Sequence, residues 1–334
     1  MKSSTSLEKR GVEFYEEWRP PDIRAMLRNT VALRFSVKAV RPRRNVIFPI
    51  AMNFGDVRRL AIIAMFSDDS LMDRLVLKGG NAMALVYSIG GRTSLDVDLS
   101  IDGDFEDLDD ARKRSFQGLR SSFDTAGYVV FDEVFEPKPA ARGSGQYKDW
   151  GGYVIDFKLI QRDRYEELRG DLEALRRNAI VTGPLQRKTF RIELSKYEFC
   201  EGKTEAELDD YAIYVYTTEM IAIEKIRALC QQLPEYTARL HKTARARDFY
   251  DIHALVAEAR VDLSSSKNLE LARNIFAAKH VPLELIPRIA EAREQHRPDW
   301  PSVEASVTGT LRSFDYYFDF VVHQIQLMKS LWIE

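Results

Sequence analysis

Two aspartates, Asp96 and Asp98, are the residues of this sequence best suited to carry chemistry. They lie in the run 94–101, whose polar and apolar residues alternate as in a β-strand. Side chains two positions apart in a strand point to the same side, so the two carboxylates converge on one spot. Mg²⁺ takes one or two carboxylates together with substrate phosphates. The pair therefore predicts a magnesium site, although the solvated face of an edge strand would show the same pattern.

A glycine turn upstream of this pair is suited to bind an anion. It follows a short apolar run, 75–77, and precedes a helical pattern over 82–89. Backbone N–H groups at a helix start favour an anion, and glycines let a phosphate approach the main chain closely. A simple tight turn is the alternative, but the combination with the aspartates favours a nucleotide site. The turn consists of Lys78, Gly79, Gly80 and Asn81.

The run LVLKGGNAMALVYSIGGRTSLDVDLS at 75–100 resembles the core motif of the AbiEii/AbiGii abortive-infection toxins, nucleotidyltransferases with a DNA-polymerase-β-like fold. That motif is a lysine-glycine-glycine turn followed by an arginine-x-serine-x-aspartate-x-aspartate strand. The matching positions are Gly79, Gly80, Arg92, Ser94, Asp96 and Asp98. Asn81 stands where threonine is commoner, and its side chain could still hydrogen-bond a phosphate. The resemblance implies Mg²⁺-dependent transfer of a nucleotide from a nucleoside triphosphate, with the turn, Arg92 and Ser94 in the nucleotide site.

A second block agrees with the first. TTEMIAIEKIRALCQQ at 217–232 resembles the family's glutamate-lysine helix, and RARDFYDIHAL at 245–255 resembles its arginine-aspartate-x-x-aspartate helix. The resemblance implies that Lys225 binds phosphate and that Asp248 is a further acidic group of the site. From the residues alone, Lys225 lies on an apolar helix face and needs a partner, either a triphosphate or Asp248. Asp248 and Asp251 could instead hold nearby arginines in structural ion pairs.

A third carboxylate is expected on a strand beside the aspartate strand. The candidates are Asp156, in the apolar run 152–160, and Glu193, in the run 189–195. We prefer Asp156, because a short carboxylate on an apolar strand is costly unless a cation offsets it. Lys158 could be that cation in place of Mg²⁺, so Glu193 stays open.

The periodicity along the chain predicts an α+β fold. Strands are expected at 75–77, 94–101, 128–135, 152–160 and 189–195, and helices at 56–65, 82–89, 107–125, 163–178, 218–233, 246–259, 268–279 and from 303 or later to 331. We expect an N-terminal appendage over 1–55. A nucleotidyltransferase core, a mixed sheet flanked by helices, follows over 56–205, and a C-terminal helical domain over 206–334.

The composition limits the setting and the partners. A net charge of −2 gives nucleic acid no general attraction, so any such site must be a local patch. Two cysteines without a CxxC pair fit a reducing compartment, and no long apolar run predicts a membrane span, so we expect a cytoplasmic protein. The histidines form no HxxxH or HExxH pair, and no GxSxG or Walker lysine motif occurs, which excludes the common zinc, serine-hydrolase and P-loop sites.

The acceptor of the nucleotide is harder to predict. Relatives that add nucleotides to the 3′ end of tRNA make RNA the leading choice, within a type IV-like toxin–antitoxin or phage abortive-infection system. Such a system implies a cognate antitoxin, often a winged-helix protein. A protein or small-molecule acceptor, or a catalytically silent nucleotide-binding module, are the alternatives. The basic patches that could bind RNA are Arg239, His241, Lys242, Arg245 and Arg247, and Arg112, Lys113 and Arg114.

Overall fold

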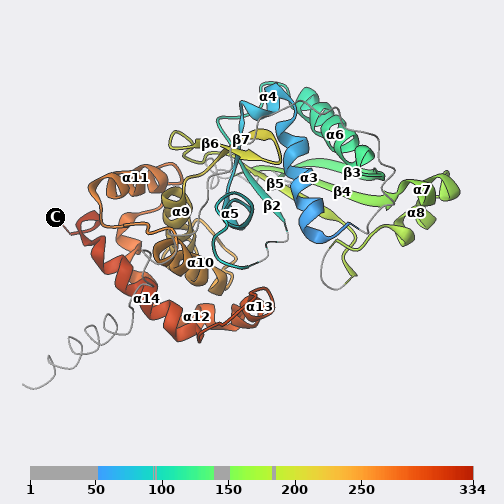
Figure 1. The fold of residues 1–334 in the computed structure, drawn as a ribbon. Helices are drawn as coiled ribbons and strands as arrows, with labels where there is room; N and C mark the ends of the chain where they lie inside the picture. Colours follow the sequence, from blue (N-terminus) through green and yellow to red (C-terminus); the bar gives the residue numbers. More distant parts are fainter. Residues whose placement is uncertain (1–51, 93, 95, 139–150, 183–185, 334) are drawn as a thin grey trace, which may run out of the picture. The chain divides into compact units, whose positions relative to one another are not determined.

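A mixed β-sheet is the centre of the fold in the computed structural model, which describes residues 52–92, 94, 96–138, 151–182 and 186–333 (Figure 1). Its seven strands follow the order β3-β4-β5-β2-β1-β7-β6. The pairs β2/β5 and β1/β7 are parallel, and the other neighbours are antiparallel. The strands are β1 (Leu75–Leu77), β2 (Val97–Ile101), β3 (Tyr128–Lys138), β4 (Gly152–Gln161), β5 (Phe190–Ser195), β6 (Thr204–Leu208) and β7 (Tyr211–Val215).

The two central strands differ in a way that explains their sequences. All three residues of β1 are buried, as expected for a strand covered on both faces. In β2, Val97 and Leu99 are completely buried on one face, and Asp98 lies on the other. Ser100 shares the face of Asp98 and is buried against Tyr216, with 2.9 Å between the two hydroxyl oxygens. The polar face of β2 is therefore open to solvent only near its start, where the aspartates lie.

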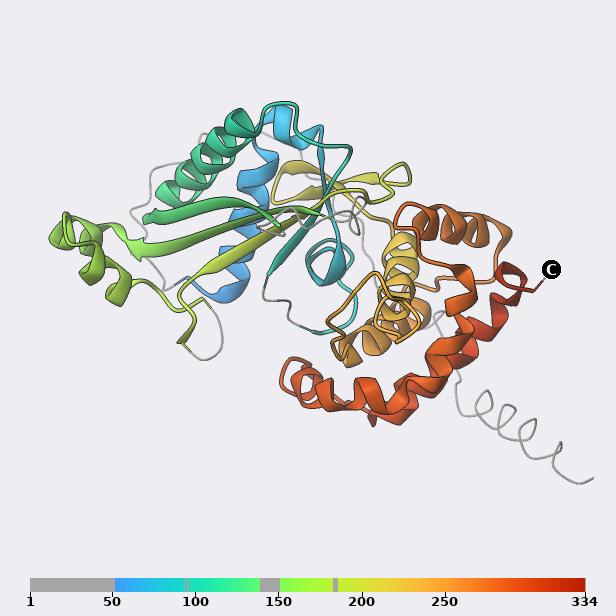
Figure 2. The ribbon, with the colours of Figure 1, turned by 180° about the vertical axis from the view of Figure 1, so that it is seen from behind.

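Helices α3 (Phe54–Phe66) and α6 (Leu108–Thr125) cover one face of the sheet (Figures 1 and 2). Asn53 caps α3, and its side chain accepts hydrogen bonds from the N–H groups of Gly55 and Asp56. The two helices pack very closely at Gly118, where a Cβ atom would fall 2.4 Å from the carbonyl oxygen of Ala64. This contact fixes the packing of the two helices that cover this face of the sheet.

A run of helices follows the sheet. Helix α9 is buried over most of its surface, and it packs against α10 and α11. Phe249 of α10 packs on Phe314 and Phe318 of α14, with ring centroids 5.6 and 5.0 Å apart. The helices are α9 (Thr218–Cys230), α10 (Ala246–Ala257), α11 (Ser266–Ala277) and α14 (Phe314–Leu327), with shorter helical turns between residues 283 and 304. The sheet and these helices confirm the expected α+β fold.

Several boundaries differ from the predicted ones. The predicted helix 163–178 is two helices, α7 (Arg162–Leu168) and α8 (Leu172–Asn178), because Gly170 between them adopts φ +96°. The predicted helix 82–89 is a short turn, α5 (Gly79–Asn81), continued by a π-helix over Ala82–Val86. Strands β6 and β7 were not predicted. Strand β2 begins at Val97, so Asp96 lies immediately before it.

The division into domains at residues 55 and 205 stays a prediction. Most of the predicted N-terminal appendage, residues 1–51, lies outside the described residues. No helix in the described part of the chain has the length and apolar character needed to cross a membrane.

Candidate active site

A cavity of about 940 Å³ gathers most of the residues singled out from the sequence. Its wall combines the glycine turn, the polar ends of β2 and β5, helices α9 and α10, and a C-terminal segment, 302–308. The predicted residues that line it are Lys78, Gly79, Gly80, Arg92, Ser94, Asp96, Asp98, Glu193, Lys225, Arg245, Arg247 and Asp248. Of the predicted catalytic and nucleotide-binding residues, Asn81 and Asp156 do not line it.

The glycine turn lies directly against Asp98. Gly79 adopts φ +66°, a conformation that side chains disfavour, and a Cβ there would come within 3.3 Å of an Asp98 carboxylate oxygen. The N–H of Lys78 donates to the main-chain carbonyl of Asp98 over 3.1 Å. At Gly80 a Cβ would meet the Arg92 guanidinium at 3.0 Å and Ser94 at 3.1 Å. The positive φ therefore favours glycine at position 79, and Gly80 leaves room for the close approach of Arg92 and Ser94.

Asn81 positions the main chain of this segment. It is completely buried, and its amide nitrogen donates to the carbonyl of Asp96 over 2.6 Å. Arg58 joins it, donating to the carbonyl of Ser94 over 2.6 Å. The Ser94 hydroxyl also donates to the Asp96 carbonyl, over 3.3 Å. The expected contact of Asn81 with phosphate is not supported, because its side chain is buried and hydrogen-bonded to the main chain of Asp96.

The Asp96 carboxylate forms an ion pair with Arg187, a residue outside the sequence motifs described above. Each side chain of this pair is about one-third exposed, 34% for Arg187 and 35% for Asp96. The two residues are separated by 91 positions, and the arginine lies in the connection before β5. An isolated arginine ahead of a strand carries no periodic signal, so only the folded chain reveals the contact.

A cluster of buried charges links α9 and α10 to the glycine turn. The Lys225 ammonium lies 3.1 Å from an oxygen of Asp248 and 2.6 Å from one of Asp251. Arg92 binds Asp251 through two hydrogen bonds of 3.0 and 2.8 Å, and Arg245 pairs with Asp248. Burial opposes ionisation of Asp248, but Arg245 and Lys225 hold its pKa well below the usual range. Three cations thus face two carboxylates, which leaves this cluster with one excess positive charge.

The start of α10 is held by two side chains rather than by a cap of its own. The N–H of Arg245 donates to Nδ1 of His296 over 3.1 Å, and that of Ala246 donates to Asp299 over 3.1 Å. Burial lowers the pKa of the completely buried His296 to about 4, so the imidazole stays neutral and can accept this bond. These contacts fix the helix turn that carries Arg245 and Asp248.

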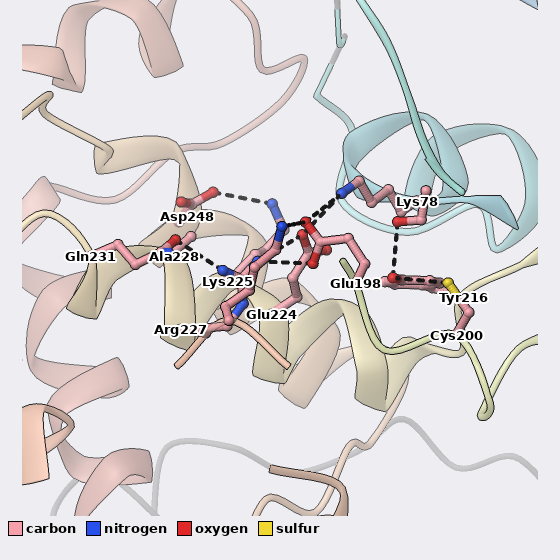
Figure 3. Close-up of polar contacts among 12 residues, drawn as sticks. Lys78, Glu198, Cys200, Tyr216, Glu224, Lys225, Arg227, Ala228, Gln231 and Asp248 are labelled. Carbon is pink, nitrogen blue, oxygen red and sulfur yellow. Dashed lines mark hydrogen bonds and ion pairs between the residues drawn. The ribbon is translucent and has the colours of Figure 1, made fainter. Parts of the chain in front are cut away.

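Lys78 belongs to a second buried cluster (Figure 3). Its ammonium lies 3.3 Å from Glu198 and 3.4 Å from Glu224. Arg227 approaches both carboxylates at 3.3 Å, and Lys279 approaches Glu198 at 3.3 Å. Glu224 and Lys225, neighbours on α9, therefore serve different clusters. Lys78 lines the cavity, but its charge is turned to two glutamates, so it joins the turn to α9.

The preference for Asp156 as third carboxylate is not supported by its position. Strand β5 lies between β4 and β2, so Glu193 of β5 is paired directly with Asp98. Asp156 lies one strand further away, where Arg191 binds it through two hydrogen bonds of 2.8 and 2.7 Å. Lys158, which could have offset the charge of Asp156, pairs with Asp132 instead. Sheet order therefore favours Glu193, which lines the cavity and pairs with Lys138 at 2.7 Å.

The donor set suits a cation that takes part of its shell from substrate. In the described ranges, no group of three or more histidine, cysteine or acidic side chains is arranged to hold a metal. Asp96 and Asp98 both line the cavity and offer carboxylate oxygens without a closed cage. Mg²⁺ prefers this arrangement of one or two carboxylates plus phosphate oxygens and water. The residues present therefore fit Mg²⁺ bound together with a triphosphate.

The two predicted basic patches differ in their setting. Arg247 is exposed and lines the cavity beside Arg245, whereas the Lys242 ammonium is bound to main-chain carbonyls at the end of α9. On α6, Arg112 and Arg114 pair with acidic residues of the same helix. The patch around 239–247 therefore has the better access to the site.

Comparison with known proteins decides the family. A model of the nucleotidyl transferase AbiEii toxins of type IV toxin–antitoxin systems matches residues 61–322. The chain belongs to this family. It is a nucleotidyltransferase of a toxin–antitoxin system, so a nucleotide is its substrate and a cognate antitoxin its partner.

Two other comparisons give no further information on the function of this AbiEii toxin. No functionally curated protein matches its sequence. A crystal structure of an antigenic nucleotidyltransferase-like protein from Paracoccidioides brasiliensis is similar at 16% identity over 77% of this chain and 94% of that chain. The TM-score is 0.34, so the similarity carries no argument about the site.

The buried ion pairs of Glu198 should stabilise the folded AbiEii toxin. Glu198→Gln leaves Lys78 and Arg227 without one of their two carboxylates, and it removes the carboxylate that Lys279 approaches. The Glu198 side chain is only 7% exposed. We expect the free energy of unfolding to fall by about 3–5 kcal/mol, as when one partner of a buried ion pair is removed. Urea unfolding measures this loss.

The matched control is Glu167→Gln. Glu167 is 62% exposed and pairs with Arg164 on the surface of α7. Its replacement should change the free energy of unfolding by less than about 0.5 kcal/mol. Equal losses for the two variants would show that the buried cluster does not stabilise the fold.

The stability of the folded protein should depend on pH through the ionisation of Asp98. Burial raises its pKa from 3.8 to about 6, and the nearby acids Glu193 and Glu224 add to this, although Lys78 opposes it. Protonated Asp98 thus contributes stability that is complete below about pH 4 and is lost as the pH rises through about 6. Asp98→Asn, neutral at every pH, should therefore gain stability relative to the parent over this interval.

Thermal unfolding with EDTA present measures the difference in Tm between Asp98→Asn and the parent at each pH. Asp96→Asn is the control, because it removes the ion pair with Arg187 and should bring no such gain. A difference that stays constant between about pH 4 and 7 would contradict the raised pKa of Asp98.

Proposed function

We propose that this AbiEii toxin transfers a nucleoside monophosphate from a nucleoside triphosphate to RNA, with tRNA 3′ ends as the leading acceptor, and that it depends on Mg²⁺. The observation that carries the proposal is the approach of Asp98 to the Gly79 turn, 3.3 Å from the position of a Cβ, in a cavity that also holds Lys225. A carboxylate, a glycine turn and a cationic cluster then line one cavity.

Each part of the cavity has a role in this proposal. Asp96 and Asp98 would hold Mg²⁺, which when bound neutralises phosphate charge and makes the α-phosphorus more electrophilic. The excess positive charge of the Lys225, Arg92 and Arg245 cluster suits the β- and γ-phosphates. Glu193, opposite Asp98 in the adjacent strand, would accept the proton of the acceptor hydroxyl.

In this proposal one P–O bond replaces another. The acceptor oxygen attacks the α-phosphorus in line with the oxygen that bridges to the β-phosphate. A new P–O bond to the acceptor forms as that bridging bond breaks, and pyrophosphate leaves while the cationic cluster neutralises its charge. The acceptor proton passes to the Glu193 carboxylate.

An RNA acceptor is supported by charge at the edge of the cavity. Arg247 is exposed there and Arg245 lines the wall beside it, so phosphates of an RNA strand could be bound next to the reacting hydroxyl. A protein or small-molecule acceptor would not need the exposed Arg247. We further propose that the antitoxin is of the winged-helix type and that the pair acts in the cytoplasm against phage infection.

The carboxylates give the sharpest test of the chemistry. Asp96→Ala and Glu193→Gln should each lower the rate of transfer from an α-³²P-labelled triphosphate, by roughly 10³-fold for the metal ligand and 10²-fold or more for the base. Asp156→Asn is the control and should stay within about twofold of the parent, because Arg191 already neutralises that carboxylate. Full activity of Asp96→Ala, or loss of activity in Asp156→Asn alone, would contradict the assignment.

The acceptor is tested with a mixture of labelled triphosphates and either total RNA or total protein. We expect the label in RNA of tRNA size, removable by ribonuclease and absent with Asp98→Asn. Label confined to protein would replace RNA as the acceptor and leave the nucleotidyl transfer intact.

A further inference from the structure

The contact between Arg187 and Asp96 joins a cation to a carboxylate that the proposed function assigns to Mg²⁺. A guanidinium nitrogen of Arg187 pairs with one Asp96 oxygen. The positive charge of the guanidinium opposes a metal ion at the same carboxylate, and it also occupies one of the two oxygens. Arg187 therefore competes with a metal ion for Asp96.

The arginine is built to be displaced without leaving the site. Its main-chain carbonyl accepts a hydrogen bond from the N–H of Thr182 over 2.7 Å, and its Nε donates to the carbonyl of Thr189 over 2.9 Å. These two bonds hold the backbone and the near side of the guanidinium. The bond to Asp96 is made by a different guanidinium nitrogen, Nη2, so the contacts with Thr182 and Thr189 do not depend on it.

Exposure separates this pair from the structural pairs beside it. The Arg92–Asp251 pair is 8% and 2% exposed, whereas Arg187 and Asp96 are 34% and 35% exposed. A partly exposed ion pair is screened by water and contributes little, so it can exchange with a stronger ligand. The Arg187 contact is therefore suited to break in each catalytic cycle.

We propose that Arg187 is a phosphate-binding residue that occupies Asp96 only in the nucleotide-free protein. It blocks metal binding in the absence of substrate, and on displacement its guanidinium binds a phosphate oxyanion at the edge of the cavity, where its planar donors fit two phosphate oxygens. The proposal rests on the metal site at Asp96 and Asp98. The phosphate belongs either to the nucleotide or to the acceptor.

The first experiment measures the metal alone. Mn²⁺ is titrated into nucleotide-free protein, and free Mn²⁺ is followed by electron paramagnetic resonance. Arg187→Ala should bind Mn²⁺ roughly two- to fivefold more tightly than the parent, because a competing ion pair of modest strength is gone. Arg187→Lys keeps the charge and should lie between the two.

Arg191→Ala is the matched control. It removes the neighbouring Arg191–Asp156 pair from the same sheet but frees no proposed metal ligand. It should leave Mn²⁺ affinity unchanged within about twofold. Mn²⁺ affinity that is unchanged or weaker in Arg187→Ala would overturn the proposal, since a purely structural arginine would not compete with the metal.

The second experiment locates the phosphate. Binding of a non-hydrolysable triphosphate analogue with Mg²⁺, and KM for the acceptor, are measured on Arg187→Ala. A roughly tenfold or larger loss in analogue affinity assigns the arginine to the nucleotide, and an equal rise in the acceptor KM alone assigns it to the acceptor. Tighter Mn²⁺ binding with neither loss would overturn the phosphate-binding role.

Failure of the underlying metal site gives a different result. If the parent binds no Mn²⁺, or binds it as tightly after Asp96→Asn and Asp98→Asn together, the metal assignment itself is wrong. If the parent binds Mn²⁺ through these aspartates and Arg187→Ala changes nothing, only the role of Arg187 is wrong.

Discussion

The site depends on the close approach of the main chain at Gly79 to the carboxylate of Asp98. A positive φ at Gly79 turns the chain sharply at the end of β1, and the missing side chain leaves room for the Asp98 oxygen. The N–H of Lys78 fixes the distance by bonding to the carbonyl of Asp98. Because β1 and β2 are neighbouring central strands, any change in their register would move the carboxylate away from the turn.

Buried charge holds the helices against this corner. Lys78 is bound by glutamates, while Lys225 and Arg92 are bound by aspartates of α10. Such clusters are costly to bury, and they are stable here because nearly every charge meets an opposite one. Their net effect is to fix Arg92 and Lys225 in one place, with some positive charge left over for a substrate. This arrangement is what a nucleotidyltransferase needs to bind pyrophosphate as it leaves.

The carboxylates on the other side of the cavity are held more loosely. Asp96 and Glu193 have partly exposed side chains that are paired with Arg187 and Lys138. In our proposal, such a pair neutralises an acidic residue until a metal ion replaces the basic partner. The site thus combines a rigid cationic wall with acidic groups whose partners can change, which is consistent with the exchange of a metal and two substrates at one place.

Much of this site followed from the sequence alone. The alternation around Asp96 and Asp98 and the glycine turn predicted the α+β fold and the aspartate side of the cavity, because local periodicity and backbone chemistry act over short distances. The resemblance to the toxin family implied the places of Arg92, Lys225 and Asp248 in the site. Tertiary structure alone decided which strand lies beside β2. It put Glu193 rather than Asp156 opposite Asp98, turned Asn81 to the main chain, and brought Arg187 to Asp96. Strand order and ion pairs between distant residues depend on how the whole chain packs, and a pattern of neighbouring residues carries no record of that.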